Sequence, residues 1–295
     1  MFGLINLNKP TAWTSHDCVA KVRKILKLKQ VGHGGTLDPA ATGVLPIAVG
    51  KATRLLPYMS DRKAYQAKIR FGVTTTTDDL EGEIIQTHSG EHLSLDDIQP
   101  HLKSFIGKIE QIPPMYSAIQ RDGKRLYELA RKGEIIDVPS RIVEIDDIEV
   151  LNWTQGEHPE IDLGIACGSG TYIRAIARDL GKALGVGGTL AQLIRTASCG
   201  LHLADSITLE QLEILRTRNN FTLISALSAL THLETIYLSS DEAQRWCQGQ
   251  AMAISVEPHS HSSVKVLTEE GQFLGMGIII TDSDNLILKP KVVLA

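Results

Sequence analysis

The sequence predicts an α+β fold, and three observations lead to that class. Segments with strand and helix patterns interleave without a regular period. Residues 65–71 (Y-Q-A-K-I-R-F) alternate between apolar and polar, which is typical of a half-buried strand. Residues 15–28 place apolar side chains at helical spacing instead. A doubly wound parallel sheet would need strands and helices in regular alternation, so α+β is favoured.

The first helix is expected to run from Ser15 to about Leu28. Serine is a common N-cap residue, and the apolar residues that follow recur at the spacing of one helix face. In the strand at 65–71, Tyr65 shares a face with apolar residues and is therefore expected to point inward. The buried stripe of the helix comprises Val19, Val22, Ile25 and Leu26.

Two further strands and a second helix are expected in the middle of the chain. Residues 141–150 and 162–167 have the composition of strands. Residues 170–174 (G-T-Y-I-R) lead into a helix with an apolar stripe, and Gly185 supplies its C-terminal stop.

A domain boundary is expected near residues 225–238. After it, a short helix at 240–248 is closed by Gly249, and two hairpin-like units follow. This pattern predicts a small, mostly β module of about 60 residues, close to the lower limit for independent stability. The first unit joins 264–267 to 273–276, and the second joins 278–281 to 286–288.

The composition indicates a soluble, globular, cytoplasmic protein. The chain has 295 residues, of which 43% are hydrophobic and 22% are charged. No apolar run reaches the roughly 20 residues that span a bilayer, so no membrane partner is expected. Lys9 and Pro10 interrupt the N-terminal segment too early for a signal peptide. The four cysteines are scattered, which favours reduced thiols.

The charge is distributed unevenly along the chain. The net charge is −4, yet residues 1–70 hold twelve Lys/Arg against three acids, a local balance of +9. The remaining 225 residues have a balance of −13. A basic lobe suggests a polyanionic partner, whereas chance clustering on a solvated helix face would give the same count. Charge alone does not decide between them.

A glycine-rich segment, residues 32–45 (G-H-G-G-T-L-D-P-A-A-T-G-V-L), carries a single acid, Asp38. Its glycines permit sharp turns and close approach to a ligand, and Pro39 stiffens the chain behind the acid. An acid presented in this way can act on a substrate. An Asp-Pro pair also commonly begins a helix, with Asp as the N-cap and Pro at the first position, and caps are the commoner case.

Arg174 and Tyr65 are the other candidates for chemistry. Arg174 falls in the first turn of its helix, where a cation opposes the helix dipole. A carboxylate facing that turn, with Asp38 as the candidate, would remove the conflict and be held ionised by the guanidinium. The alternative is a surface stripe with Arg178 and Lys182. A tyrosine on such a strand is more often a core residue than a catalytic one, although a buried phenol needs a hydrogen-bond partner.

Several common sites are excluded by their motifs. Residues 43–53 resemble a phosphate loop, but Ala52 replaces the required Ser/Thr and the spacing is too long. The sequence has no metal-binding motif, G-x-S-x-G or G-x-G-x-x-G. One acid, one arginine, one tyrosine and a basic approach surface, without a cofactor, would suit an enzyme that acts on a flipped-out base.

The ordered motifs identify a family. The chain resembles the bacterial tRNA pseudouridine-55 synthases of the TruB type, and eight motifs appear in the family's order. These are residues 8–10 (N-K-P), 32–45, 63–65 (K-A-Y), 77–83 (T-D-D-L-E-G-E), 113–118 (P-P-M-Y-S-A), 123–133 (G-K-R-L-Y-E-L-A-R-K-G), 170–174 and 193–196 (L-I-R-T).

The resemblance implies a pseudouridine synthase catalytic domain over residues 1–232. Its central sheet would be mixed, mostly antiparallel and flanked by helices, with a thumb-like RNA-clamping segment at about 111–137. A small β-rich PUA-like RNA-binding domain would occupy residues 233–295. The implied activity is isomerisation of uridine to pseudouridine at position 55 in the tRNA T-loop, without metal or cofactor. The T-arm of tRNA would be the partner of a cytoplasmic monomer that needs no protein partner.

The resemblance also assigns roles to residues. Asp38 would be the catalytic aspartate, Arg174 its ion-pair partner, and Tyr65 the ring that stacks on the flipped uracil. Gln120 departs from the family, which usually has lysine there. The implied substrate-binding residues are His33, Tyr172 and Leu193 around the nucleotide, Gly34 and Gly35 in the close-approaching backbone, and Lys9, Lys21 and Lys24 at phosphates.

Three alternatives remain from the sequence. A non-catalytic RNA-binding or tRNA-folding protein would lack the intact set of Asp38, Tyr65 and Arg174. A guide-RNA-directed synthase of the archaeal and eukaryotic kind would be more basic and carry larger extensions. A generic α+β hydrolase would need a nucleophile and base pair, which the sequence does not offer.

Overall fold

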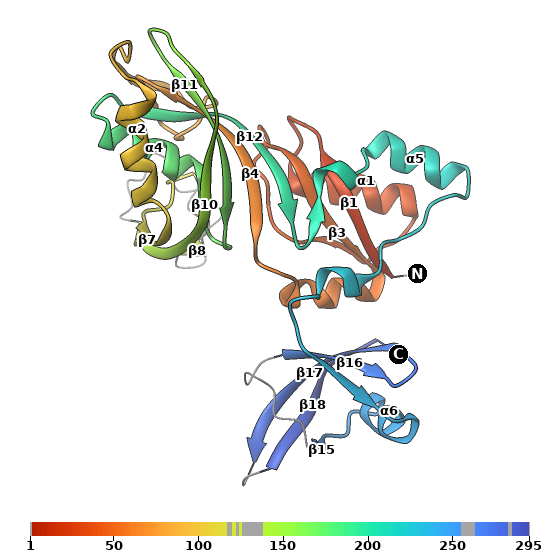
Figure 1. Ribbon diagram of the computed structural model, residues 1–295. Helices are drawn as coiled ribbons and strands as arrows, with labels where there is room; N and C mark the ends of the chain where they lie inside the picture. Colours follow the sequence, from red (N-terminus) through yellow and green to blue (C-terminus); the bar gives the residue numbers. More distant parts are fainter. Residues whose placement is uncertain are drawn as a thin grey trace.

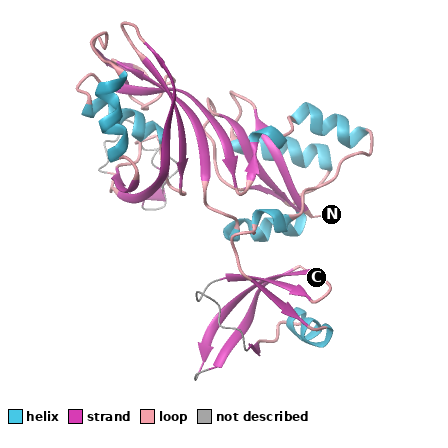
Figure 2. Cartoon of the chain, in the orientation of Figure 1, coloured by secondary structure: helices cyan, strands magenta, loops and turns pink. Residues whose placement is uncertain are grey.

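The computed structural model describes residues 2–116, 120–121, 124–125, 138–254, 263–282 and 285–294. One large mixed sheet dominates it, with the strand order β1-β3-β12-β4-β11-β10-β7 (Figures 1 and 2). Only the short β3–β12 pairing in this sheet is parallel among the described strands. The prediction of an α+β fold with a mixed, mostly antiparallel sheet is therefore confirmed. The strands are β1 (Gly3–Lys9), β2 (Val31–His33), β3 (Thr42–Val49), β4 (Lys63–Phe71), β7 (Gly107–Gln111), β10 (Arg141–Thr154), β11 (Glu160–Cys167), β12 (Gly188–Ser198) and β13 (Leu201–His202).

Helices cover the two halves of the sheet separately. One half buries a core between β4, β11, α2 and α4, and the other packs α1 and α5 against β1 and β3. Each half thus has its own hydrophobic core, with β12 running between them (Figure 1). The helices are α1 (Ser15–Leu26), α2 (Leu95–Ser104), α4 (Ile173–Ala183) and α5 (Leu209–Thr217), with 3-10 helices η1 (Gly50–Tyr58), η2 (Leu203–Asp205) and η3 (Ala226–Ala229).

Helix α1 forms where the sequence predicts it, but its cap differs. Thr14 is the N-cap, and its hydroxyl accepts from the backbone N–H of Asp17 while the Asp17 carboxylate accepts from Thr14. Ser15 is instead buried, and its hydroxyl contacts the backbone N–H and carbonyl of Leu37 at 2.9 and 3.2 Å. The prediction of Ser15 as the cap is wrong because Thr14 is the residue that can form a capping box with Asp17. Ser15 ties the helix to the glycine-rich segment.

Strand β4 shows the alternation that the sequence predicts. Tyr65, Ala67, Ile69 and Phe71 are all buried, and the residues between them face outward or are half-buried. The predicted strands at 141–150 and 162–167 also form, within β10 and β11, and the helix that ends at Gly185 forms as α4.

Strand β12 joins the two halves of the sheet. It pairs with β4 in antiparallel register, where Arg195 lies opposite Tyr65, and briefly with β3 in parallel, where Arg195 lies opposite Gly43. Gly43 has a φ of +102°, and a Cβ atom there would lie 2.3 Å from the Arg195 carbonyl oxygen. Glycine is required at this crossing because any side chain would prevent β3 from approaching β12.

The C-terminal part forms a five-stranded sheet, β14-β16-β17-β18-β15, with helix α6 (Ser240–Cys247) packed on it. Both hairpin connections form, but residues 273–276 and 278–281 belong to one strand, β17. The two predicted hairpin-like units are therefore confirmed, but they share one strand, since Gly277 continues the ladder to Pro290 of β18. The strands are β14 (Thr235–Leu238), β15 (Met252–Ile254), β16 (Ser263–Thr268), β17 (Phe273–Asp282) and β18 (Asn285–Val293).

The small sheet packs against η1 of the large domain. The Lys51 ammonium donates to the Leu294 carbonyl at 2.8 Å, and the Arg54 guanidinium donates to the Val293 carbonyl at 2.8 Å. Met276, Val292 and Leu294 share a buried cluster with residues of η1. Across the described ranges, no helix combines the length and apolar character needed to cross a membrane.

Candidate active site

A cavity of about 270 Å³ opens beside the glycine-rich segment. The segment before β3 forms one wall, β4 forms the floor, and the turn from β11 into α4 forms the opposite wall. The structure brings Asp38, Tyr65, Arg174, Tyr172, Leu193 and Gly35 together here, although they lie far apart in the sequence. The lining consists of Gly35, Thr36, Leu37, Asp38, Lys63, Tyr65, Gly168, Gly170, Thr171, Tyr172, Ile173, Arg174 and Leu193.

Asp38 does not cap a helix. The Asp38 carbonyl accepts from the Ala41 N–H at 3.1 Å, which closes a turn, and the chain then enters β3. Its side chain is 42% exposed and borders the cavity. The cap interpretation, the commoner case for an Asp-Pro pair, is therefore wrong here, and the carboxylate is free to face a ligand.

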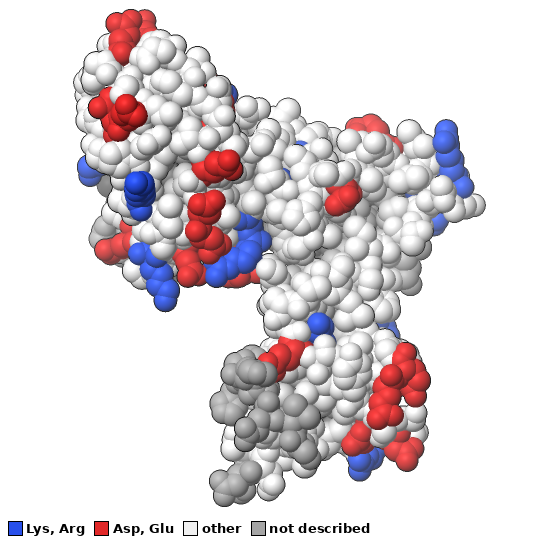
Figure 3. All heavy atoms as spheres, viewed as in Figure 1, with Lys and Arg blue, Asp and Glu red and all other residues white. Residues whose placement is uncertain are grey.

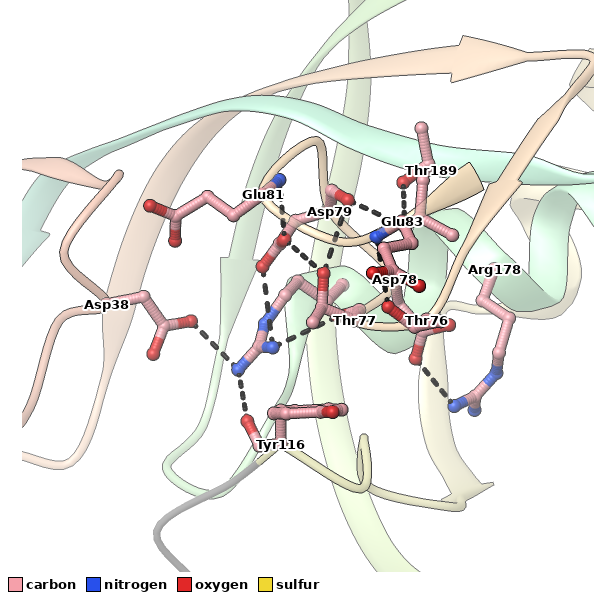
Figure 4. A network of polar contacts seen from close by, with 12 residues as sticks. Asp38, Thr76, Thr77, Asp78, Asp79, Glu81, Glu83, Tyr116, Arg178 and Thr189 are labelled. Carbon is pink, nitrogen blue, oxygen red and sulfur yellow. Dashed lines mark hydrogen bonds and ion pairs between the residues drawn. The ribbon is translucent and has the colours of Figure 1, made fainter. Parts of the chain in front are cut away.

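Arg174 lies buried at the start of α4 and holds two carboxylates (Figure 4). Its guanidinium is 3.0 Å from a carboxylate oxygen of Asp38 and 3.4 Å from one of Asp79. It also donates to the backbone carbonyls of Thr77 and Tyr116 at 3.1 and 2.9 Å. The predicted Asp38–Arg174 ion pair is confirmed, and the surface-stripe alternative is wrong. Anions at this helix start offset the unfavourable position of a cation there.

Asp79 completes this network, and the sequence reasoning missed its role. It lies in the T-D-D-L-E-G-E motif, and its carboxylate accepts from the Thr77 hydroxyl at 2.5 Å and from the Glu81 N–H at 3.1 Å. The neighbouring Asp78 pairs with Arg178 at 3.1 Å. Burial raises the pKa of Asp78, and Arg178 opposes that shift. The sequence does show two adjacent acids, Asp78 and Asp79, in this motif, but it does not tell which of them turns toward Arg174.

Tyr65 is both a core residue and part of the cavity floor. Its side chain belongs to the core of the β4 half, and only 8% of the residue is exposed. Burial raises its pKa, so the phenol remains protonated at neutral pH. Arg195 lies opposite it in the β4–β12 ladder, and the positive charge of Arg195 opposes this rise in the pKa of Tyr65. From the sequence, Tyr65 could be either a core residue or a site residue, and in the structure it is both.

Arg195 is a second residue whose role the sequence reasoning missed. Its guanidinium is fully buried, and it donates to the carbonyls of Val44, Thr36 and Gly35 at 2.7, 3.2 and 3.1 Å. These carbonyls lie on both sides of Asp38 in the sequence, so one side chain fastens both ends of the segment that carries the acid. The L-I-R-T motif was visible, but its arginine could be given no partner from the sequence.

His33, Gly34 and Gly35 precede Asp38 in the glycine-rich segment, and of these three Gly35 lines the cavity. The His33 Nδ1 accepts from the Gly35 N–H at 3.3 Å, and the His33 ring meets the His16 ring edge-on at 5.4 Å. Burial lowers the pKa of His33, and His16 adds to the shift, so the ring is neutral at physiological pH. A Cβ on Gly34 would contact Cys199 and Pro46 at 3.3 Å, which leaves little space for a larger residue.

The expectation that Lys9 meets phosphate is wrong. Its residue is fully buried, and its ammonium donates to the carbonyls of Pro10, Trp13 and Pro39 at 2.9, 2.6 and 3.1 Å. Burial lowers the pKa of Lys9. All three donors of a lysine ammonium are thereby used. Lys9 instead holds the turn that follows Asp38.

The remaining predicted contacts lie at different places. Lys21 pairs with Glu213 at 3.3 Å, and Lys24 is exposed on the same helix. Tyr172 borders the cavity, where its backbone N–H and carbonyl both bond to the Gln111 amide. Leu193 lines the cavity from β12. Most of the predicted thumb at 111–137 lies outside the described residues, as does the side chain of Gln120.

Figure 3 shows basic and acidic side chains intermixed on one face of the molecule. Within the described residues, basic and acidic side chains also form ion pairs, such as Arg62 with Glu144 and Asp146 at 2.8 and 2.7 Å. The excess of basic residues in the first 70 positions therefore does not form a continuous basic surface on this face. No group of three or more His, Cys, Asp or Glu side chains in the described parts is placed to hold a metal ion.

Family models match nearly the whole chain. Residues 23–173 match the model described as TruB family pseudouridylate synthase (N terminal domain). Residues 174–233 match the tRNA pseudouridylate synthase B C-terminal domain, and residues 235–294 match the model described as Pseudouridine synthase II TruB, C-terminal.

Similar proteins share both sequence and fold with this chain. A tRNA pseudouridine synthase B of Gloeothece citriformis is 62% identical over 100% of this chain and 98% of its own length. One of Microcystis aeruginosa is 58% identical, over 100% and 99%. The solved structure of an H/ACA RNP bound to a substrate RNA containing 2′-deoxyuridine has a TM-score of 0.76 and 25% identity, covering 100% of this chain and 86% of that one.

Proposed function

The chain belongs to the TruB family of pseudouridine synthases, and we propose that this isomerase, which converts uridine to pseudouridine in tRNA, acts at position 55 of the T-loop. The reaction breaks the N1–C1′ bond, turns the uracil and joins C5 to C1′, and the proton on C5 is released. The product has the same atoms as the substrate apart from proton exchange. The observation that carries the proposal is the Asp38–Arg174 pair beside Tyr65 in one cavity.

Asp38 is the group that acts on the nucleotide. Its carboxylate is the one in the described cavity lining, it is partly exposed, and Arg174 at 3.0 Å stabilises its ionised form. Tyr65 offers a flat ring on the floor for the base to stack against. Burial raises the pKa of the Tyr65 phenol, so it keeps its proton at neutral pH. Its hydroxyl is therefore available to exchange a proton with the base once the uridine is bound.

The recessed position of this site requires a flipped nucleotide. Tyr65 is almost wholly buried, and a base within a stacked helix cannot reach it. Of the other residues, His33, Gly34 and Gly35 approach the extruded nucleotide from one side, and Tyr172 and Leu193 border it from the other. Lys21 and Lys24 lie along one exposed helix, where they can contact phosphates of the T-arm.

We assign residues 1–232 to a catalytic domain and residues 233–295 to a PUA-like RNA-binding domain, with a clamping thumb at about 111–137. The separate cores of the large sheet and the small sheet support this division. The protein would act in the cytoplasm as a monomer without a partner protein. This distinguishes it from the RNP in the similar solved structure, whose name states that it is assembled with RNA and protein.

Tritium release and sequencing together test the proposal. The protein is incubated with a tRNA transcript labelled with tritium at C5 of uridine, and with a matched transcript that has cytidine at position 55. We expect release of one tritium per tRNA from the first transcript and none from the second, with pseudouridine mapped at position 55. Equal release from both transcripts would place the modification elsewhere, and no release from either would contradict the isomerase.

A further inference from the structure

Four cations surround the glycine-rich segment, and three of them make several contacts with groups of the protein. Lys9 and Arg195 each donate to three backbone carbonyls. Arg174 holds two carboxylates and two carbonyls. Lys63 differs from these three, because it lines the cavity and its ammonium makes one hydrogen bond, to the Asp61 carbonyl at 3.2 Å.

Lys63 thus keeps donors that no described group uses. A lysine ammonium has three donors. Within the described ranges, no carboxylate lies within ion-pair distance of Lys63, whereas Lys68 on the same strand pairs with Asp162 at 3.0 Å and Glu160 at 3.5 Å. Burial lowers the pKa of Lys63, and the nearby Arg195 charge adds to that shift. A bound anion would offset both effects, so this corner of the cavity favours a negative group.

The position of Lys63 relates this corner to the bound nucleotide. Lys63 and Tyr65 are two residues apart on β4 and therefore lie on the same face of the strand. The Lys63 Cε lies 3.6 Å from where a Cβ on Gly35 would be, so the side chain reaches across to the segment that carries Asp38. A nucleotide stacked on Tyr65 would have its backbone within reach of this ammonium.

We propose that Lys63 binds a backbone phosphate that flanks the flipped uridine, a role that rests on the proposed function. At neutral pH the uracil and the ribose of a uridine are uncharged, so its phosphodiesters are the anions that it brings. Arg174 stabilises Asp38 at one side of the cavity, and Lys63 receives the substrate's charge at another. The cavity can then hold the Asp38 carboxylate in its ion pair with Arg174 and still accept the negatively charged RNA backbone.

A double-mutant cycle with a neutral linkage tests this role. The tRNA is assembled with an uncharged methylphosphonate at the linkage on the 5′ or the 3′ side of the target uridine. Dissociation constants are measured with Asp38→Asn protein, with and without Lys63→Gln. We expect one of the two neutral linkages to weaken binding about tenfold for the protein with Lys63. Lys63→Gln should weaken binding of the charged RNA by a similar factor and show no further loss with that neutral linkage.

Two further variants make the outcome specific. Lys68→Gln removes a lysine from the opposite face of β4 and should leave the response to the neutral linkage unchanged. Lys63→Arg keeps the charge and should restore most of the response. If Lys63→Gln responds to both neutral linkages as strongly as the protein with Lys63, the inference is wrong. A slower isomerisation in Lys63→Gln, with unchanged coupling to the phosphates, would also overturn it. Tritium release by wild-type protein from unmodified tRNA tests the proposed function separately.

Discussion

Two buried arginines hold the segment that carries Asp38, and they do so by different chemistry. On the α4 side, Arg174 contacts the carboxylates of Asp38 and Asp79 at 3.0 and 3.4 Å. On the β12 side, Arg195 contacts only neutral acceptors among its described hydrogen-bond partners, the carbonyls of Val44, Thr36 and Gly35. Arg174 therefore orients the carboxylate of Asp38 through an ion pair, whereas Arg195 fixes the path of the backbone that carries Asp38.

The two arginines are therefore expected to have different roles at the same cavity, Arg174 in the reactivity of the carboxylate and Arg195 in the backbone structure. A guanidinium beside a carboxylate changes the energy of that carboxylate directly. A guanidinium bonded to carbonyls satisfies buried acceptors and fixes backbone geometry, and removing it leaves those acceptors unpaired. Substitution of Arg174 should thus lower activity more than stability, and substitution of Arg195 should lower stability more than activity.

The largest expected effect is on activity, from Arg174→Met. Asp38 and Asp79 would face each other without the intervening cation, and Asp38 would lose its orientation. We expect kcat to fall by about 100- to 1,000-fold, the scale for removing one hydrogen-bond donor from a preorganised site. Single-turnover tritium release from C5-labelled tRNA measures this. Arg178→Met, which removes the neighbouring pair with Asp78, is the matched control and should retain far more activity.

Arg195→Met should act mainly on stability. Three buried carbonyls would lose their donor, and we expect the free energy of unfolding to fall by about 3 kcal/mol. Urea denaturation followed by circular dichroism measures the change. Arg195→Lys restores one or two of the bonds and should recover part of it. If Arg195→Met unfolds like the wild type but is inactive, then Arg195 belongs with Arg174 in the chemistry, and the comparison fails.

Smaller effects are expected from Lys9 and Lys24, and the two lysines should differ in what they change. Lys24 should affect the salt dependence of tRNA binding, and Lys9 should affect stability. Lys24→Ala removes an exposed cation from α1 and should lower the slope of log K against log salt for tRNA binding by about 1. Lys9→Met should leave that slope unchanged and lower the free energy of unfolding by about 2 kcal/mol, because Pro10, Trp13 and Pro39 lose a shared donor. A slope that falls with Lys9→Met would return Lys9 to the RNA-binding surface.

The smallest effect is the titration of His33. Burial and His16 lower its folded pKa, so the unfolded chain takes up this proton at a higher pH than the folded one. The free energy of unfolding should consequently decrease as the pH falls below 6.5. NMR titration should place the His33 midpoint below 6.5, and His16→Ala should move it upward. An unchanged midpoint in His16→Ala would remove His16 as a cause.

The fold could be predicted from local patterns because periodicity is local. The alternation in β4 and the apolar stripe of α4 depend only on neighbouring residues, and both form as predicted. The Ser15 cap was wrong because Thr14 offers an equivalent hydroxyl one position earlier. The two predicted hairpin-like units share one strand, β17, because Gly277 does not break it.

The site could be predicted only in part, since its contacts are distant in sequence. The Asp38–Arg174 pair followed from an electrostatic argument about the helix start, and it forms. The roles of Asp79 and Arg195 depend on which way a loop residue turns and on which strands meet at Gly43. The family resemblance placed Lys9 at phosphate, whereas three backbone carbonyls accept from its ammonium here.

We propose that Asp38 performs the chemistry and that the residues around it hold it in position. The most direct measurement is single-turnover tritium release from C5-labelled tRNA by wild type, Asp38→Asn and the control Asp61→Asn, whose exposed side chain accepts from the Ser169 hydroxyl. Asparagine keeps the shape of Asp38 without the charge, so tRNA binding should stay within about threefold of wild type while release becomes undetectable. Asp61→Asn should release tritium like the wild type. Release by Asp38→Asn at the wild-type rate would contradict the account.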